Sequence, residues 1–157
     1  MSIGRDGLAA AVVDDFFYAI AGYNRHSRWL NSVEKYDLQS NKWTSVASLN
    51  IPRGASAATT FKNQIIICGG EFNFGVVAKC EIYNPASDAW TLTSESCKLH
   101  DYAAMAVLNE RIYLIGGMGQ KTVEVLDDNF TEWSLVNPQL QDERFSMGAV
   151  VFQKCYV

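Results

Sequence analysis

One eighteen-residue pattern recurs along this 157-residue chain and constrains its fold more than any other feature. It is clearest in RGASAATTFKNQIIICGG, residues 53–70, where small residues lead into a Lys-Asn turn, an isoleucine run and two glycines. The same frame occurs at residues 5–22 and 100–117, and a fourth copy begins at Arg144 and stops at Val157 before its glycines. Self-similarity at a nearly fixed period is the signature of a repeat architecture.

The spacing inside each copy predicts four short strands. In every complete copy a Tyr or Leu precedes a Trp by seven positions, and the copies start 48, 47 and 44 residues apart. Only the stretch after the glycines varies much in length. Four strands in a unit of about 45–50 residues are typical of a β-propeller blade. The predicted fold is therefore all-β: a partial propeller with repeats at 5–52, 53–99 and 100–143 and a truncated repeat at 144–157.

Alternation and turn residues place the strands. The expected strands are Leu8–Val13, Phe16–Ile20, Ser32–Tyr36 and Trp43–Val46 in copy one, Ala55–Phe61, Ile65–Cys68, Cys80–Tyr83 and a strand at Trp90 in copy two, and Ala103–Leu108, Ile112–Ile115, Val123–Leu126 and a strand at Trp133 in copy three.

The repeated glycines and aromatic residues have packing roles in such a fold. Paired glycines at a strand end permit positive φ and close backbone approach. Large rings fill the wedge between twisted sheets, and burying each contributes about 2–3 kcal/mol. We therefore expect structural roles for Gly22, Gly69, Gly70, Gly116, Gly117, Tyr36, Tyr83, Trp43, Trp90 and Trp133.

Composition excludes several classes of function. A hydrophobic fraction of 48% and a charged fraction of 19% are those of a globular protein. The net charge of −4 provides no basic surface for nucleic acid, and no apolar run is long enough to span a membrane. With two histidines and no recognisable catalytic motif, the sequence predicts no metal site, no cofactor and no enzymatic activity.

The four cysteines bear on the compartment. Cys68, Cys80, Cys97 and Cys155 show no C-x-x-C spacing and no histidine at ligand spacing. Scattered thiols favour a reducing compartment, and no secretory leader is recognisable. The sequence therefore predicts a cytoplasmic protein, with association with the cytoskeleton as an alternative.

These landmarks resemble the kelch repeat. Paired glycines after a hydrophobic strand, a Glu-x-Tyr-Asp segment and a Trp seven residues after the Tyr carry the likeness, and copy one, with LNSVEKYD at residues 30–37, is similar to the repeats of BTB-kelch proteins. The resemblance extends from Arg5 to Phe152. It departs from the family pattern at Ala21, which replaces the first glycine, and at His100 and Leu126 in copy three.

The resemblance implies more blades than this chain holds. Kelch propellers close with about five to seven blades, whereas this chain contains three copies and part of a fourth, with no BTB or BACK segment. We therefore expect a fragment of a longer protein, whose unpaired terminal blades promote self-association. The alternative is that two chains complete a six-bladed ring.

The loops after the glycines are the first candidate binding site. Loops at one rim of a propeller carry its interactions, and exposed aromatics beside Asn and Arg are typical of protein-recognition surfaces. The alternative is a solvated loop whose aromatics fold back onto the blade. The candidates are Tyr23, Asn24, Arg25, His26, Arg28 and Trp29 in copy one, Glu71, Phe72, Asn73 and Phe74 in copy two, and Met118, Gly119, Gln120 and Lys121 in copy three.

The second candidate set lies at the start of each copy and comprises Arg5, Arg53, His100, Tyr102 and Arg144. Equivalent positions on successive blades form a ring around the central channel. In some BTB-kelch proteins, arginines at this position and an aromatic after the glycines hold acidic peptides. The resemblance implies that role for Arg5, Arg53, Arg144 and Tyr23, and the Arg fork suits a carboxylate. The alternative is that each Arg bonds local carbonyls or nearby acids.

Two functions follow from the resemblance. The first is the substrate-recognition part of a BTB-kelch adaptor for a cullin-RING ubiquitin ligase, which binds a protein partner, expected to be an acidic peptide. The second is an actin-binding cytoskeletal protein. A third alternative is a partial product without function, because an incomplete ring is only marginally stable.

Overall fold

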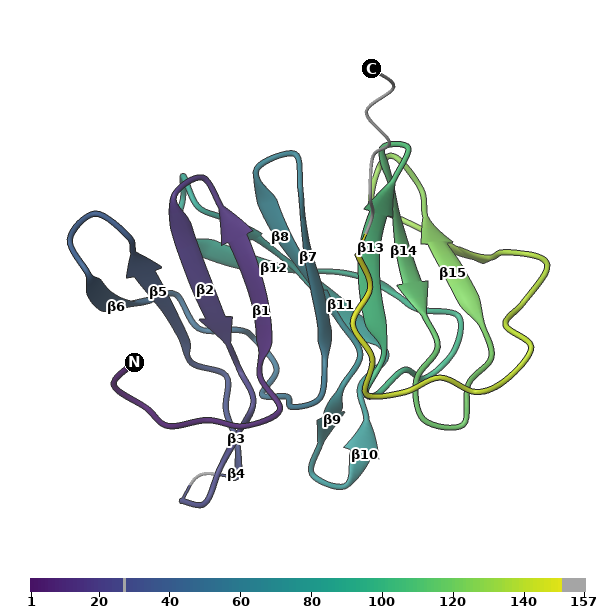
Figure 1. Ribbon diagram of the computed structural model, residues 1–157, viewed down its shortest axis with the longest axis horizontal. Helices are drawn as coiled ribbons and strands as arrows, with labels where there is room; N and C mark the ends of the chain where they lie inside the picture. Colours follow the sequence, from purple (N-terminus) through teal and green to yellow (C-terminus); the bar gives the residue numbers. More distant parts are fainter. Residues whose placement is uncertain (27, 151–157) are drawn as a thin grey trace.

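Three four-stranded antiparallel sheets stand side by side like the blades of a fan (Figure 1). The computed structural model describes residues 1–26 and 28–150. We number the sheets blade 1 to blade 3 in chain order. Their inner strands are adjacent, the first strand of blade 2 lying between those of blades 1 and 3. Among the described residues there is no helix, and thus none that could cross a membrane. The predicted all-β fold of propeller blades is confirmed.

The strands follow the order that the repeats predict. Blade 1 comprises β1 (Ala9–Val13), β2 (Phe16–Ile20), β5 (Val33–Asp37) and β6 (Lys42–Val46). Blade 2 comprises β7 (Ala57–Phe61), β8 (Gln64–Cys68), β11 (Lys79–Asn84) and β12 (Ala89–Glu95). Blade 3 comprises β13 (Ala104–Leu108), β14 (Arg111–Ile115), β15 (Val123–Leu126) and β16 (Trp133–Leu135). Residues 144–150 form no strand, and residues 151–157 of the predicted fourth copy lie outside the described residues.

Two-residue hairpins join the first two strands of each blade. Lys62 and Asn63 both have positive φ (47° and 61°), as do Asn109 and Glu110 (49° and 57°). Two successive residues of positive φ define the type I′ turn, whose twist matches that of antiparallel strands, and Asn tolerates this conformation well. The turn chemistry therefore fixes the strand register that brings the repeated apolar residues onto one face.

Blades 2 and 3 each pack a row of large side chains against the blade before them. In blade 2 the row contains Ile65, Tyr83 and Trp90, which are buried with residues of blade 1 in one core. The Trp90 indole N–H donates a hydrogen bond to the carbonyl of Ala47 in blade 1 at 3.0 Å. In blade 3, Trp133 is buried against blade 2 in a second core. Both tryptophans thus fill the wedge between neighbouring sheets.

A disulfide between Cys68 and Cys80 corrects the expectation of scattered thiols. The two residues end β8 and follow the start of β11, and both are fully buried. Twelve positions separate them in sequence, but the strand pairing of β8 with β11 brings them together. Cys97 is a free, exposed thiol. Cys155 lies outside the described residues.

We predict that reduction of this bond lowers stability without changing the fold. Closing a loop of this length contributes about 3 kcal/mol in the chain-entropy account. Chemical denaturation of the wild type with and without a thiol reductant measures the difference. The control is Cys68→Ile with Cys80→Val, the pair that blade 1 has as Ile20 and Val33. This variant should fold, and its unfolding midpoint should be the same with and without the reductant. Identical unfolding midpoints for the wild type in the two conditions would contradict the prediction.

Candidate functional site

The residues that open the copies are buried inside the blades. The side chains of Arg5, Arg53 and His100 have no exposed surface. Each faces a glutamate on the third strand of its own blade, at 2.9 Å, in the pairs Arg5–Glu34, Arg53–Glu81 and His100–Glu124. We call these the buried pairs. Because these side chains are satisfied by partners within the fold, this arrangement corrects the expectation that Arg5, Arg53 and His100 line a peptide-binding ring.

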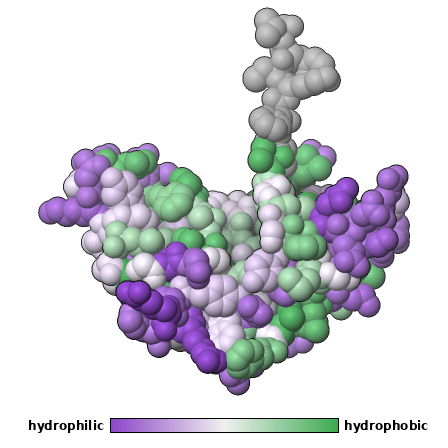
Figure 2. Space-filling model, turned by 60° about the horizontal axis from the view of Figure 1, so that its bottom comes forward, coloured by the Kyte–Doolittle hydropathy of each residue, from purple (hydrophilic) through white to green (hydrophobic). Residues whose placement is uncertain are grey.

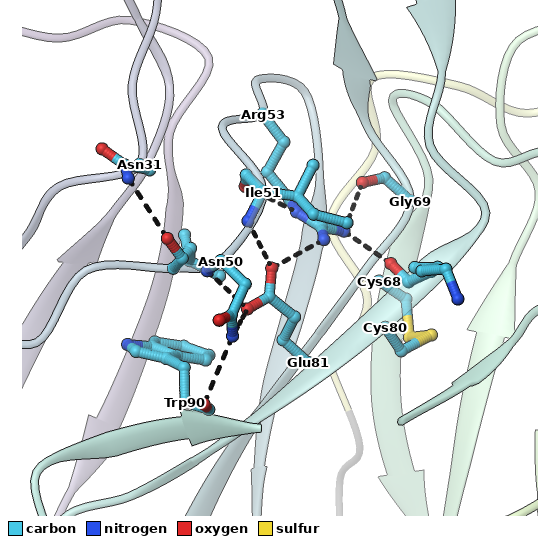
Figure 3. A network of polar contacts seen from close by, with 11 residues as sticks. Asn31, Asn50, Ile51, Arg53, Cys68, Gly69, Cys80, Glu81 and Trp90 are labelled. Carbon is cyan, nitrogen blue, oxygen red and sulfur yellow. Dashed lines mark hydrogen bonds and ion pairs between the residues drawn. A yellow bond between two sulfur atoms is a disulfide. The ribbon is translucent and has the colours of Figure 1, made fainter. Parts of the chain in front are cut away.

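The pair in blade 2 shows how the contacts work (Figure 3). One guanidinium nitrogen of Arg53 donates to Glu81 and another to the carbonyl of Gly69 at 3.1 Å. The carboxylate of Glu81 in turn accepts hydrogen bonds from the backbone N–H groups of Asn50 and Ile51, at 2.8 and 3.1 Å. The pair therefore joins the segment that enters blade 2 to the glycine that ends its second strand.

The same contacts recur in register in the other blades. Arg5 donates to the carbonyl of Ala21, and the ring Nδ1 of His100 donates to that of Gly116. Both ring nitrogens of His100 face acceptors, since Nε2 lies 2.9 Å from the carboxylate of Glu124. The two ring nitrogens thus reach the same kinds of acceptor, a strand-end carbonyl and a glutamate, that the guanidinium reaches in the other copies.

Hydrogen bonding keeps the carboxylates of Glu34 and Glu124 ionised. Burial alone raises the pKa of Glu34, but hydrogen bonds from Ser2 and Arg5 outweigh it and hold the pKa below its usual value. The pKa of Glu124 is likewise lowered, because hydrogen bonds from His100 and the backbone N–H of Cys97 overcome the effect of burial. Both groups therefore remain charged at neutral pH.

The glutamates were the structural residues that sequence reasoning missed. Each lies two positions before the repeated Tyr or Leu in all three copies, as Glu34, Glu81 and Glu124. A glutamate at a fixed position of a strand, at the same repeat period as a cation, could have indicated the pairing.

We predict that Arg53→Met destabilises the protein strongly, because it leaves the Glu81 carboxylate buried and unpaired, at a cost of about 3–5 kcal/mol. Arg144→Met is the matched control at the equivalent repeat position: Arg144 is exposed and makes no ion pair within the described residues. Its effect should stay within about 0.5 kcal/mol. Urea denaturation of both variants measures this, and equal losses would refute the structural role of Arg53.

The candidate binding residues that are accessible to solvent lie where the chain leaves each glycine pair. The segments predicted as polar loops form two short ribbons, β3 (Tyr23–Asn24) with β4 (Arg28–Trp29), and β9 (Glu71–Phe72) with β10 (Gly75–Val76). Both project from the same end of the blades (Figure 1). Gly70 permits this exit: its φ is +87°, and a Cβ there would lie 2.4 Å from the carbonyl of Gly54.

Four aromatic rings from the two ribbons form one surface, which we call the aromatic platform: Tyr23, Trp29, Phe72 and Phe74. The Trp29 ring lies at its centre, with centroids 5.3 Å from Phe74, 5.9 Å from Phe72 and 6.3 Å from Tyr23. Phe74 is 80% exposed. The structure thus brings together candidates from copies one and two, and Phe74 faces solvent rather than folding back onto the blade.

Tyr23 anchors the platform to the blades. Its ring lies directly over Gly54, where a Cβ would meet the ring at 2.3 Å, and its hydroxyl donates a hydrogen bond to Glu71 on the neighbouring ribbon. Burial, reinforced by that hydrogen bond, raises the pKa of Tyr23, so the phenol stays neutral. The contact fixes one ribbon relative to the other.

Cationic and amide side chains border the platform. The Arg28 guanidinium lies over the Phe74 ring, 5.5 Å from its centroid. Arg25 and Asn24 line a hollow of about 440 Å³ beside the platform, which Asp6 also borders. Figure 2, which turns this end forward, shows strongly hydrophilic side chains close to apolar ones on this face. A surface of this kind can hold an apolar residue of a peptide and a neighbouring carboxylate.

The third loop makes its backbone contacts with its own blade. Met118 is exposed, and its N–H donates to the carbonyl of Asp101, while the N–H of Gln120 donates to that of Gly117. Tyr102, half-buried, has a positive φ of 54° and donates its N–H to the carbonyl of Ala55. Met118 and Gln120 thus lie outside the aromatic platform, whereas the Tyr102 side chain interacts with the phenol of Tyr23.

The described residues contain no cluster of three or more His, Cys, Asp or Glu side chains suited to a metal ion. The groups that the platform and its border offer are ring faces, arginine and amide side chains.

Comparison with known proteins gives consistent matches. A family model described as Kelch motif matches residues 4–50. Kelch-like protein 25 of Xenopus tropicalis is 30% identical over 126 residues, covering 74% of this chain and 21% of that protein. Kelch-like protein 35 of Mus musculus is 31% identical over 105 residues, covering 66% of this chain and 18% of that protein. The chain thus spans about a fifth of the length of these relatives.

Two further matches cover more of the chain. Alpha-scruin of Limulus polyphemus is 27% identical over 171 residues, covering 99% of this chain and 18% of that protein. A solved structure entitled "Structure of YjhT" superposes with a TM-score of 0.75 at 16% identity, covering 88% of this chain and 54% of that one. At this identity the likeness shows the fold alone.

Proposed function

We propose that this chain, a kelch-repeat protein similar to the kelch-like proteins, holds a protein partner on its aromatic platform. Its units are the repeats 5–52, 53–99 and 100–143, with a fourth beginning at residue 144. The observation that carries the proposal is the convergence of two ribbons on one surface of four rings and an arginine, on which Phe72 and Phe74 are exposed. We assign it no catalytic role and no cofactor.

The occupant that suits this surface is an extended peptide with an acidic residue next to an apolar one. Arg25 and Arg28 supply charge at the edge, and Phe74 and Trp29 supply ring faces that lose little conformational freedom on binding. In this proposal the accessible arginines of the loop bind the acidic residue of the peptide, the role that the resemblance implied for the buried arginines.

In the parent protein, the finer role that we favour is substrate recognition for a cullin-RING ubiquitin ligase. There a BTB segment would dock the ligase scaffold, and the kelch blades would present the substrate. The protein would then act in the cytoplasm. The alternative is an actin-binding cytoskeletal protein, which follows from the resemblance to kelch proteins of that kind.

We predict that Phe74→Ala and Arg28→Ala each weaken peptide binding by about tenfold or more, the loss typical of an aromatic or arginine hot spot. The probes are arrayed extended peptides that combine acidic with aromatic or aliphatic residues, and the dissociation constant is measured by fluorescence anisotropy. The matched control is Leu92→Ala, an exposed apolar residue of blade 2 outside the platform, which should bind as the wild type does. Unchanged affinity in both platform variants would refute the site.

The two finer roles are separated by different probes. Co-sedimentation with actin filaments that Phe74→Ala abolishes and Leu92→Ala preserves would favour the cytoskeletal role. Under the adaptor role, the chain stays in the supernatant, and the platform substitutions placed in the full-length protein lengthen the lifetime of its substrate in cells.

A further inference from the structure

The Cys68–Cys80 disulfide encloses the ribbon that carries Phe72 and Phe74. Cys68 is the last residue of β8, and Cys80 is the second residue of β11. Residues 69–79 between them comprise the glycine pair, β9, β10 and the segment that leads into β11. The covalent bond therefore joins the two ends of the ribbon that supplies half of the aromatic platform.

Strand pairing at the base of this ribbon differs from that in the other blades. There, the ladder between the second and third strands includes the residues equivalent to the two cysteines, as the pairs Ile20–Val33 and Ile115–Val123. In blade 2 the ladder between β8 and β11 ends, on the ribbon side, at the pair Ile67–Glu81. The register of β11 against β12 shifts at the same place. The disulfide thus holds the two strands together where their backbone ladder has already ended.

Polar contacts share this base with the disulfide. One guanidinium nitrogen of Arg53 donates hydrogen bonds to the carbonyl of Gly69 at 3.1 Å and to that of Lys79 at 2.6 Å. Gly69 and Lys79 are the residues next to the two cysteines on the ribbon side, and Figure 3 shows Arg53 and Gly69 beside the disulfide. The Val77 N–H also donates to the carbonyl of Gly70 at 2.8 Å. These contacts therefore depend on the same spacing of the two strand ends that the disulfide sets.

Reduction of the bond changes this spacing. Both cysteines are 0% exposed and pack in the core between blades 2 and 3. Two unbonded sulfur atoms need more room than a bonded pair, and a close-packed interior does not provide it. The strand ends must therefore move apart. Because the ladder between β8 and β11 holds the strands on one side of the cysteines, the movement falls on the other side, where the ribbon begins.

We propose that the oxidation state of Cys68 and Cys80 controls peptide binding at the aromatic platform, an inference that rests on the proposed function. With the disulfide formed, Phe72 and Phe74 are held beside Trp29 before the peptide arrives. With the two thiols reduced, the ribbon loses its fixed base. Ordering its two rings again then consumes part of the free energy of binding, so the reduced chain binds the peptide more weakly.

The reductant is a dithiol of the kind that keeps cellular thiols reduced. Its first thiolate attacks one sulfur of the bond and releases the other cysteine, which takes up a proton; its second thiolate then attacks the mixed disulfide and releases the first cysteine. Two electrons and two protons thus pass to the protein, and the dithiol becomes a disulfide. Because both sulfurs are buried, the ribbon must open before the attack. In the cytoplasm, where we place the proposed function, disulfides are usually of this transient, redox-sensing kind.

Binding and reduction are linked in both directions. If the disulfide raises the affinity for a peptide about tenfold, the bound peptide makes the disulfide about tenfold harder to reduce. For this two-electron couple, that factor lowers the midpoint potential by about 30 mV. A disulfide that served stability alone would leave the potential unchanged when a peptide binds.

Hydrogen exchange of the full chain tests the effect on the ribbon without any partner. After reduction with a dithiol, residues 69–79 should exchange about tenfold faster, whereas β1 and β2 of blade 1 should keep their rates. The matched control, Cys68→Ile with Cys80→Val, should exchange at the same rate with and without the dithiol. Cys97→Ser, which removes the exposed thiol, should respond as the wild type does. Unchanged exchange in residues 69–79 overturns the proposal, and so does loss of protection throughout blade 1, which would mean that the whole chain unfolds.

Binding is measured by fluorescence anisotropy with the arrayed peptide that the oxidised wild type binds most tightly. Reduction should raise the dissociation constant of the wild type about tenfold and leave that of the Cys68→Ile, Cys80→Val variant unchanged. Saturating peptide should lower the midpoint potential of the wild type by about 30 mV. A reduced wild type that binds as tightly as the oxidised form overturns this inference and leaves the proposed function intact. If no arrayed peptide binds the oxidised chain, the proposed function itself fails, whatever the exchange rates, and the inference falls with it.

Discussion

A buried carboxylate on the third strand of every blade, paired with an Arg or His side chain from the segment that enters the blade, is the contact on which this structure depends. An unpaired charge at such a site would cost several kcal/mol, so the cation and the strand must come together whenever the blade forms. The carboxylate also accepts two backbone N–H groups of the entering segment, as Glu81 does from Asn50 and Ile51. The same side chain therefore completes one sheet and fixes the link from the sheet before it.

The loop site takes its rigidity from this contact. Arg53 holds the carbonyl of Gly69, and the next residue, Gly70, bonds to the segment that enters blade 3. The ribbon that carries Phe72 and Phe74 therefore leaves from a fixed point. Because Tyr23 of the other ribbon bonds to Glu71, the two ribbons hold each other, and their rings form one surface. The backbone contacts from which the ribbons start are of the kind that recurs from blade to blade, whereas the exposed side chains of the ribbons differ between the copies.

The blades show which positions tolerate substitution. Where blade 1 has Ile20 and Val33, blade 2 has the Cys68–Cys80 disulfide and blade 3 has Ile115 and Val123. These positions require apolar volume, and the disulfide adds a covalent link to a site that packing alone fills in the other blades. Replacement of Arg by His100 is tolerated for a different reason, since the two ring nitrogens point at the same two kinds of acceptor, a carbonyl and a glutamate. The geometry of the contacts is retained although the residue type changes.

The platform was predictable in its members but not in its form. Exposed aromatics after the glycines indicated Tyr23, Phe72 and Phe74, because loop length and chemistry vary there. That Trp29 would contact Phe74 of another copy could not be read from spacing, since it depends on the angle between two blades. The opening arginines were misassigned for the same reason: a sequence shows a cation at a fixed period but not which glutamate, 28 or 29 positions later, it will face.

By itself, the sequence determined the repeat, and with it the four-stranded sheets, their turns and the residues that fill the wedge between them. These are properties of period and local chemistry, which act along the chain. Tertiary structure alone decided which charges are buried, which thiols are joined and which rings from different blades meet. Those outcomes depend on how close two sheets approach, and that distance is set by the packing of the whole fan.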